Sequence, residues 1–427
     1  MTLWPLVAAT YFMVSGGPYG LEELVQKAGY DRALLLILLT PLLWSLPTAI
    51  MVGELAAALP ETGGYYAWVR RALGPFWGFQ EAWLSLAASF FDMAIYPTLF
   101  TLYLGRIWPP ASSGLTQIAI GAAMIAGCAV WNLRGARAVG GASLLLSLIL
   151  LAPFLALLLG SVAQPAVAAP PPSSSTLLGG LIIAMWNFMG WDNASTVASE
   201  VKRPQRTYPR AMLVTVALVA LSYALPIWAC RHAGIDPSRW TTGAWVDAGT
   251  SIGGKALGLA MVVGGVACGV GMFNALVLSY SRVPLAMAQD GLLPKLFART
   301  DPHTGAPIWA VVGCAVAYTA CLGLGFDRLV LLDVVLYGLA LSLEFVALVA
   351  LRLKEPRLPR PFRVPGGLVG AVLIAVAPLG LLGLALRAAF SEASWASIAL
   401  AGGLVALGPL LYLVVRRGHV AVDSTTP

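Results

Sequence analysis

The stretch that decides the fold is Ser15-Gly16-Gly17-Pro18-Tyr19-Gly20-Leu21-Glu22-Glu23, which interrupts an apolar segment over residues 3–26. Proline lacks a backbone donor and glycine loses conformational entropy in a helix, so this stretch cannot continue an α-helix. The interruption falls about ten residues into the segment, near the centre of a bilayer that the segment is long enough to cross. Lipid cannot satisfy free N–H and C=O groups, so unwound backbone at that depth must line a cavity enclosed by protein. The stretch therefore predicts half of a binding site.

The composition is that of a membrane protein rather than a soluble domain. Hydrophobic residues make up 59% of the 427 residues and charged residues 11%, against about 25% charged in a typical soluble chain. The first segment lacks a basic leader, so we expect no cleavable signal peptide. Five scattered cysteines without metal-ligand spacing are interpreted as core residues, and neither a metal site nor a cofactor is predicted. We attribute the formal charge of +7 to cytoplasmic loops rather than to nucleic acid binding.

Twelve apolar segments are long enough to cross a bilayer, which takes about 20 residues. We therefore expect an all-α integral membrane protein with twelve transmembrane helices. The segments are residues 3–26, 33–59, 76–104, 115–133, 140–163, 176–201, 210–230, 254–288, 306–325, 329–352, 366–390 and 395–416. If the N-terminus is cytoplasmic, 18 of the 26 Lys and Arg residues fall on the cytoplasmic side. Basic residues favour that side, so we expect a multi-pass protein of the cell membrane with both termini cytoplasmic.

A second interruption lies in the sixth segment, at Met185-Trp186-Asn187-Phe188-Met189-Gly190-Trp191-Asp192-Asn193-Ala194-Ser195. Broken helices at corresponding positions of two five-helix units indicate an inverted-repeat transporter with a midplane site. We expect a first repeat over 1–163, a second repeat over 176–352 and accessory helices over 366–416. A Pro/Ser-rich linker over 164–175 separates the repeats, and a short interfacial helix is expected over 60–71.

Several motifs resemble the amino acid–polyamine–organocation superfamily: Pro60-Glu61-Thr62-Gly63-Gly64-Tyr65, the run over 200–209, and Ser281-Arg282 with the run over 288–294. Three stretches are similar to the polyamine uptake transporters of plants and protozoan parasites: residues 14–23, residues 73–80 with Asp92 and Tyr96-Pro97, and Trp186-Asn187 with Trp191-Asp192. The resemblance implies a LeuT-like fold of twelve helices with five-plus-five symmetry, alternating access, and proton-coupled polyamine uptake. Other members transport neutral or cationic amino acids, and most of those have a Gly-Ser-Gly-Ile-like break where this chain has a proline.

Carboxylates inside the apolar segments are the main clue to the substrate. Six of them lie away from the segment ends or at the breaks, and no Lys or Arg lies deep in any segment. The six are Glu22, Glu54, Glu81, Asp92, Asp192 and Glu344. A buried carboxylate without a partner either takes a proton or waits for a cation, so this excess predicts a cationic substrate, a proton, or both.

At the first break we expect Ser15, Gly16, Gly17, Tyr19 and Glu22 to contact the substrate. Glu22 follows the break, where the start of the second half-helix offers N–H groups and a positive dipole end. In amino acid carriers this helix end receives a substrate carboxylate, as the resemblance implies. A carboxylate of the protein at this place can accept an amine or a proton instead. The alternative is that Glu22 only caps the half-helix.

At the second break we expect Trp186, Asn187, Trp191 and Asp192 to contact the substrate. Aromatic faces beside a carboxylate favour an amine through cation–π attraction, which is worth roughly 0.5–2 kcal/mol for each ring. The alternative is that Asp192 caps the second half-helix and that the tryptophans only pack.

Asp92, near the centre of the third segment, and Tyr96, one turn beyond it, are expected to line the same cavity. Glu81 lies eleven residues before Asp92, so the two share a helix face at a separation of roughly 16 Å. Such a pair suits a long diamine or two stations of a proton path. A structural hydrogen bond to a neighbouring helix is the alternative.

Gating and coupling depend on residues elsewhere. Tyr337 and Glu344, seven residues apart in the tenth segment, are expected to act as gate or proton groups, and Glu54 is expected to pair with loop arginines. The eighth segment has no Ser or Thr at its middle and the fifth has no Lys. This argues against the sodium site and the proton-carrying lysine of some relatives. Glu22 or Asp92 would then carry the proton, and exchange without a coupling ion stays open.

The sequence thus predicts a proton-coupled importer of polyamines or related organic cations, with an amino acid permease or exchanger as the alternative. A non-transporting scaffold has no reason to break two helices, and no nucleophile–base pair points to an enzyme. The expected partners are a polyamine or amino acid, a proton and the bilayer. Neither nucleic acid nor an obligatory protein partner is indicated, although a role as one subunit of a two-chain transporter stays open.

Overall fold

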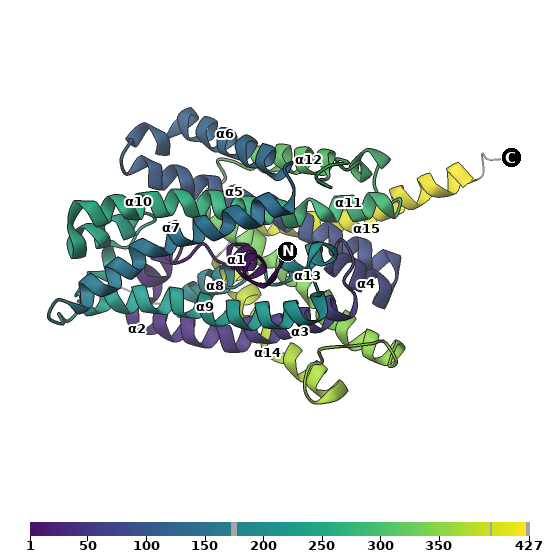
Figure 1. The fold of residues 1–427 in the computed structure, drawn as a ribbon, viewed down its shortest axis with the longest axis horizontal. Coiled ribbons are helices and arrows are strands. Elements are labelled where there is room, and N and C mark those ends of the chain that lie inside the picture. The colour runs from purple at the N-terminus through teal and green to yellow at the C-terminus, as the bar shows by residue number, and fades with distance from the viewer. Residues whose placement is uncertain (172–176, 393–394, 424–427) are drawn as a thin grey trace.

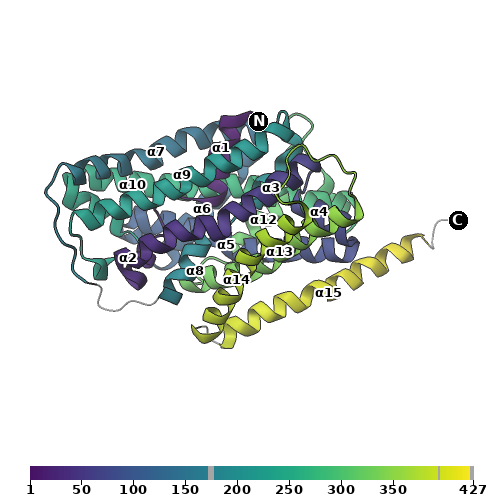
Figure 2. The same cartoon turned by 90° about the horizontal axis from the view of Figure 1, so that it is seen from below.

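The computed structural model describes residues 1–171, 177–392 and 395–423, in which the chain is helical throughout, with two isolated bridges and no strand. Most helices run along the long axis of a single bundle (Figures 1 and 2). The α-helices are α1 (Leu3–Val14), α2 (Glu22–Thr40), α3 (Leu46–Ala58), α4 (Tyr65–Leu73), α5 (Pro75–Gly105), α6 (Gly114–Asn132), α7 (Ala136–Val162), α8 (Leu177–Asn187), α9 (Pro204–His232), α10 (Ala244–Tyr280), α11 (Arg282–Gln289), α12 (Ile308–Ala320), α13 (Phe326–Lys354), α14 (Gly367–Glu392) and α15 (Trp395–Asp423). A π-helix, η1 (Pro41–Ser45), and four 3-10 helices complete the set: η2 (Pro109–Ser112), η3 (Asp192–Glu200), η4 (Pro237–Arg239) and η5 (Lys295–Ala298).

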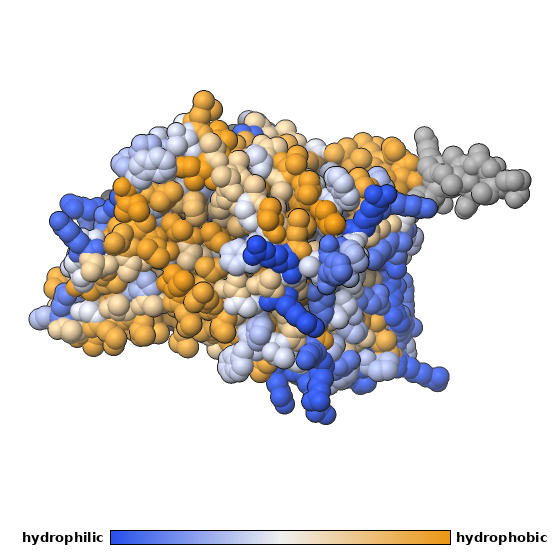
Figure 3. Space-filling model, turned by 45° about the horizontal axis from the view of Figure 1, so that its top comes forward, coloured by the Kyte–Doolittle hydropathy of each residue, from blue (hydrophilic) through white to orange (hydrophobic). Residues whose placement is uncertain are grey.

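Many of these helices can cross a membrane. Within the described residues, nine helical stretches have the length and the apolar composition of a membrane span, and α1 and α12 are shorter apolar helices. The nine are Glu22–Ala58, Pro75–Gly105, Gly114–Asn132, Ala136–Val162, Pro204–His232, Ala244–Gln289, Arg328–Lys354, Gly367–Arg387 and Trp395–Val415. Figure 3 shows hydrophobic residues over the broad middle of one face, with hydrophilic residues gathered most densely at the right-hand end. The protein is therefore a multi-pass membrane protein.

One end of the bundle carries much of the basic charge. It is formed by α4, η3, α11 and the last turn of α13, which bring together Arg70, Arg71, Arg282, Arg352 and Lys354. We call it the basic end. It is the right-hand end in Figures 1 and 3.

Helices occur at the predicted segments, but several boundaries were wrong, two of them at kinks within a helix. Residues 27–32, predicted as a loop between the first two segments, are helical, because α2 continues through them with a kink at Gly29 (φ 71°, ψ 169°). The eighth segment begins at Ala244 rather than at residue 254, with a kink at Gly253 and Gly254. Glycine tolerates these angles, so the helix changes direction without ending. The interfacial helix expected over 60–71 is present as α4, and the number of membrane crossings stays a prediction.

The first predicted break is present between α1 and α2, over residues 15–21. Gly17 and Gly20 have positive φ angles of 67° and 94°, which glycine adopts at little cost. The unwound backbone finds its partners within the protein: Gly17 N donates to Ser15 Oγ at 3.0 Å, and Trp245 Nε1 donates to Pro18 O at 2.9 Å. The break is thus a buried and hydrogen-bonded feature, as its depth requires.

The second predicted break separates α8 from η3, over residues 188–191, and turns at Gly190 (φ 88°). The half-helix expected after it is a 3-10 helix over Asp192–Glu200 rather than an α-helix. The expected linker over 164–175 and the start of the second repeat at residue 176 lie partly outside the described residues.

The two broken helices occupy the middle of the bundle. α1 packs against α7, α9 and α10, and α8 packs against α2, α13 and α14. α6 and α12 lie side by side on one flank, and α15 runs along the outside (Figures 1 and 2). This arrangement places the two breaks between α5, α10 and α13.

Candidate functional site

A cavity lies where the two breaks meet α5, α10 and α13. Its volume is about 20 Å³, which is room for about one water molecule. The residues that line it are Met13, Val14, Gly16, Tyr19, Asp92, Tyr96, Trp186, Asn187, Met189, Gly190, Asn193, Met272, Tyr280, Asp333 and Tyr337. Six of the predicted substrate contacts belong to this wall: Gly16, Tyr19, Asp92, Tyr96, Trp186 and Asn187. Tyr337, predicted as a gate, lines it too.

Asp92 projects from the middle of α5 and is 5% exposed. Three side chains donate to its carboxylate: Tyr96 Oη at 2.5 Å, Trp186 Nε1 at 3.4 Å and Tyr280 Oη at 3.4 Å. The donors come from α5, α8 and α10, so the carboxylate joins three helices at the cavity wall. All three are neutral, and they leave the negative charge of Asp92 without a counter-charge.

Asp333 is the functional candidate that sequence reasoning missed. It lines the cavity, is 3% exposed, and receives no hydrogen bond from any described residue. The tenth segment was predicted to begin at residue 329, which placed Asp333 close to a segment end. α13 begins at Phe326 instead, so Asp333 lies two turns inside the helix. Its spacing of one turn from Tyr337 was the signal that could have revealed it.

The rest of the cavity wall is largely aromatic. Tyr19, Tyr96, Trp186, Tyr280 and Tyr337 supply its rings, and no Lys or Arg is among the lining residues. A cavity with two carboxylates, aromatic faces and no basic side chain has the chemistry of an amine site.

Glu22 lies outside this wall. Its carboxylate accepts hydrogen bonds from Gly20 N at 2.7 Å, Gly243 N at 3.1 Å and Tyr103 Oη. The bond from Gly20 belongs to the break itself, so Glu22 holds the turn that precedes its own helix.

Ser15 and Gly17 belong to the internal bonding of the break rather than to the cavity wall. Gly16 faces the cavity, and a Cβ atom there would come within 2.6 Å of Met272 Sδ. A larger residue there would require Met272 and also Cys268, whose Sγ would lie 2.4 Å from the added Cβ, to shift.

Asp192 and Trp191 are also buried beside the cavity rather than in its wall. Tyr337 Oη donates to Asp192 and accepts from Gly190 N at 3.0 Å. Trp191 Nε1 donates to Phe188 O at 2.8 Å. The Asp192 carboxylate also interacts with the backbone N–H groups of residues 192 and 193 at the start of η3, so the capping alternative stays open. Both residues hold the second break in shape, and Tyr337 connects Asp192 to the cavity.

Glu54 pairs with arginines, as expected. It is fully buried and receives Arg352 Nε at 3.0 Å, Arg360 Nε at 3.3 Å and the backbone N–H of Val364 at 2.6 Å. Glu344 differs. It is equally buried, but neither of its carboxylate oxygens has a hydrogen-bond partner among the residues that the structure describes, and it does not line the cavity.

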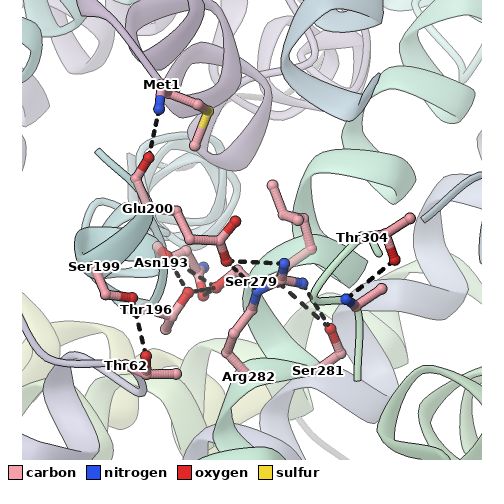
Figure 4. A network of polar contacts seen from close by, with 12 residues as sticks. Met1, Thr62, Asn193, Thr196, Ser199, Glu200, Ser279, Ser281, Arg282 and Thr304 are labelled. Carbon is pink, nitrogen blue, oxygen red and sulfur yellow. Dashed lines mark hydrogen bonds and ion pairs between the residues drawn. The ribbon is translucent and has the colours of Figure 1, made fainter. Parts of the chain in front are cut away.

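A polar network lies at the basic end, next to the second break (Figure 4). Arg282 donates to Glu200 at 3.0 and 3.1 Å, and Thr62 and Ser199 share a hydrogen bond of 2.9 Å. Ser279 Oγ lies 2.9 Å from Asn193 Oδ1. These contacts tie η3 to α10, α11 and the loop before α4.

Apolar helices, two breaks in the bundle interior and an enclosed polar cavity define a membrane transporter. The chain matches the amino acid permease family over residues 7–407. It belongs to this family, within the amino acid–polyamine–organocation superfamily that its motifs resemble.

Named relatives match over nearly the full chain. The polyamine transporter RMV1 of Arabidopsis thaliana is 34% identical over 435 residues, which cover 100% of this chain and 88% of that protein. The polyamine transporter PUT1 of Oryza sativa subsp. japonica is 33% identical over 424 residues, covering 98% of this chain and 79% of that protein. An uncharacterized transporter of Legionella pneumophila, lpg1691, is 25% identical over 376 residues, with 79% and 78% covered.

Proposed function

We propose that this protein imports polyamines or closely related organic cations across the cell membrane, coupled to protons, by alternating access. The observation that carries the substrate assignment is the cavity, where Asp92 and Asp333 are buried among aromatic rings with no basic side chain in the wall. The names of the plant relatives support the same substrate class.

Ammonium groups match this wall in charge and in shape. Each carboxylate can accept a charge-assisted hydrogen bond from an ammonium group, and the tyrosine and tryptophan faces attract the same cation. Two carboxylates on two different helices suit a substrate with two separated amines. They repel the carboxylate of an amino acid.

The N–H groups at the breaks also disfavour an amino acid. An amino acid site of this architecture needs helix-end N–H groups that are free to receive the substrate carboxylate. Here Gly17 N donates to Ser15, Gly20 N donates to Glu22, and Gly190 N donates to Tyr337. These three N–H groups are therefore not free to receive a substrate carboxylate, which supports a cationic substrate over an amino acid.

Transport requires the cavity to open. A volume of about 20 Å³ is far below the hundreds of Å³ of a typical small-molecule site, so the helices must separate to admit a polyamine. The proposed movement is between two inverted repeats over 1–163 and 176–352, each opened by a broken helix, with accessory helices over 366–416. The excess of basic residues at the basic end places that end and both termini in the cytoplasm in this proposal.

Glu22 and Asp92 were predicted to carry the coupled proton as well as to contact substrate. In this proposal Asp92 binds the amine together with Asp333. The three donors on Glu22 favour a structural role for it, with Ser15, Gly17 and Trp191 as further supports of the two breaks.

The test is uptake into proteoliposomes, with labelled putrescine, spermidine, arginine and alanine compared with and without an inward proton gradient. We expect the two polyamines to accumulate and the gradient to increase their accumulation, whereas arginine and alanine do not enter. Glu22→Gln should lower the thermal stability of the protein and leave its apparent affinity for putrescine largely unchanged. Entry of alanine or arginine without polyamines would move the assignment to the amino acid alternative.

A further inference from the structure

A second group of buried carboxylates lies between the cavity and the basic end. Glu81 on α5 and Glu344 on α13 are both fully buried. Each lies eleven residues from a cavity carboxylate on its own helix, Asp92 or Asp333, which corresponds to about 16 Å along the axis. α5 runs away from the basic end and α13 runs toward it, so the two spacings point in the same direction. The two glutamates therefore form a second pair on the same two helices, about three turns closer to the basic end than the pair of aspartates.

The atoms of this second pair are largely without partners. Ser85 Oγ donates to Glu81 Oε1 at 2.9 Å, but Glu81 Oε2 and both oxygens of Glu344 receive no hydrogen bond. A third side chain points to the same place: the Tyr65 hydroxyl of α4, on a fully buried side chain, makes no hydrogen bond of good geometry within the described residues, and Ser85, the donor to Glu81, lies within its reach. The electrostatic interactions of Tyr65 are with Asp192, Glu81 and Glu344.

Asp192 connects this group to the cavity. It interacts electrostatically with both Glu81 and Glu344, which also interact with each other. Tyr337 Oη donates to Asp192, and the Tyr337 ring lines the cavity. The titratable groups that face these three carboxyl groups are Tyr65 of α4, Tyr337 and Asp333 of α13, and, through Tyr65, Tyr280 of α10 and Tyr318 of α12.

Within the described residues, no Lys, Arg or His interacts with Glu81, Glu344 or Asp192. Arg352 and Arg360, on the same side of the molecule, are engaged by Glu54. Three carboxylates that interact in a low-dielectric interior cannot all be ionised, so protons are shared among them. The described residues hold no group of three Asp, Glu, His or Cys side chains able to ligate a metal ion. A proton neutralises such a group without any further ligand from the protein.

We propose that Glu81, Glu344 and Asp192, bordered by Tyr65 and Tyr337, form a proton-binding site separate from the amine site at Asp92 and Asp333. It binds a proton on a carboxylate oxygen as a carboxylic acid and releases it to water when the basic end opens. Tyr337 couples this site to the cavity, because its hydroxyl donates to Asp192 and accepts from Gly190 N while its ring lines the cavity. The inference rests on the proposed function and assigns its proton coupling to residues outside the amine site.

The first test separates coupling from substrate binding. Glu81→Gln and Glu344→Gln keep the size of the side chain, and Glu61→Gln, at an exposed glutamate before α4, is the matched control. Exchange of labelled putrescine at equal concentrations on both sides needs no gradient and should stay within about twofold of wild type. An inward gradient of one pH unit can drive about tenfold accumulation for each coupled proton. We expect both site variants to lose this accumulation, and the proton influx reported by an internal dye, while Glu61→Gln keeps both.

The second test needs no substrate. Infrared spectra of the purified protein at neutral pH should show the C=O stretch of buried, protonated carboxyl groups, with lower intensity in Glu81→Gln and Glu344→Gln. Full accumulation in both variants, or an unchanged band in both, would overturn the proposal. If wild type takes up putrescine under the inward proton gradient without any proton influx, the proton site fails while the polyamine assignment stands. If no polyamine enters, the polyamine assignment fails, and the infrared band still decides the proton site.

Discussion

Helix α13 carries two buried charged regions that are built in opposite ways. At its last turn, Arg352 pairs with Glu54, a residue 298 positions away in the sequence, and Arg360 and Val364 N complete the shell around the same carboxylate. In its middle, neither oxygen of the fully buried Glu344 has a hydrogen-bond partner among the described residues, and Asp333, which is 3% exposed, lines a cavity whose wall holds no Lys or Arg. One region compensates its charge within the protein, and the other does not.

The difference separates structural from functional carboxylates. A buried ion pair whose carboxylate is fully hydrogen-bonded can hold elements together. Here it joins α3, α13 and the proline-rich linker that includes Arg360 and Val364. An uncompensated buried carboxylate costs free energy unless a proton or a cation neutralises it. We therefore expect the carboxylates in the middle of α13 to bind a ligand, and the ion pair at its last turn to stabilise the fold.

The largest effect is expected where the paired region is broken. Arg352→Leu leaves Glu54 with one of its two arginines and should destabilise the protein by about 3–5 kcal/mol. Thermal unfolding of the purified protein in detergent measures this. Arg357→Leu, at an exposed arginine of the same linker, is the control and should stay within about 0.5 kcal/mol of wild type. An unchanged unfolding temperature for Arg352→Leu would remove the distinction between the two regions.

The next effect is expected in the unpaired region, on binding rather than on stability. Asp333→Asn and Asp92→Asn should each weaken the apparent affinity for putrescine about ten- to hundredfold, because a hydrogen bond to a charged group is worth about 1.5–3 kcal/mol. Their unfolding temperatures should not fall, since each change removes an uncompensated charge. Asp247→Asn, at the partner of Arg106 outside the cavity wall, is the matched control. A variant of Asp333 that transports with wild-type affinity would show that this carboxylate does not meet the substrate.

A smaller effect tests the aromatic wall. Trp186→Leu should weaken putrescine affinity by about 2- to 30-fold, the equivalent of a cation–π contribution of roughly 0.5–2 kcal/mol. Trp186→Phe keeps an aromatic face and should lose less, although it also removes the N–H that reaches Asp92. Uptake kinetics over a range of putrescine concentrations give both values, with the exposed Trp108→Leu as control. Equal losses in the two Trp186 variants would assign the effect to the N–H group instead of the ring.

The smallest effect is expected at a paired carboxylate that is open to solvent. Glu355 accepts hydrogen bonds from Arg71 at 2.7 and 2.9 Å, and this contact lowers the pKa of its carboxyl group. A lowered pKa stabilises the fold above the unfolded-state pKa, and the contribution is lost as the pH falls through the folded-state value. Arg71→Gln should therefore cost about 0.2–1 kcal/mol near neutral pH and nothing in acid. The measurement is the unfolding temperature of wild type and of Arg71→Gln from neutral to acid pH. A difference between the two proteins that did not shrink in acid would contradict the pairing.

The helix breaks could be predicted from the sequence because their cause is local. Gly17, Gly20 and Gly190 take backbone angles that other residues adopt only with strain, and Pro18 lacks a donor. The kink at Gly29 was missed because a glycine between charged residues, here Lys27, Asp31 and Arg32, is equally typical of a loop between two helices.

The functional carboxylates could be predicted only in part. Asp92 was found because it stands alone near the centre of a long apolar segment. Asp333 was missed because its depth depended on where α13 begins, and segment ends are the least certain feature of a sequence. Glu22 and Asp192 were placed at the correct breaks, but the sequence could not show that their partners are Tyr103, Gly243 and Tyr337.

The sequence by itself determined a membrane protein with two buried helix breaks, an excess of acidic over basic residues within its apolar segments, and membership of a transporter superfamily. These properties follow from composition, from proline and glycine chemistry and from motifs that lie within short stretches. Only the tertiary structure decided which carboxylates meet arginines, which line the cavity and which lie together without partners. Electrostatic and hydrogen-bond energies depend on distance through space: the sequence indicated arginine partners for Glu54, but only the fold shows that these are Arg352 and Arg360 and that Glu344 has none within the described part of the chain.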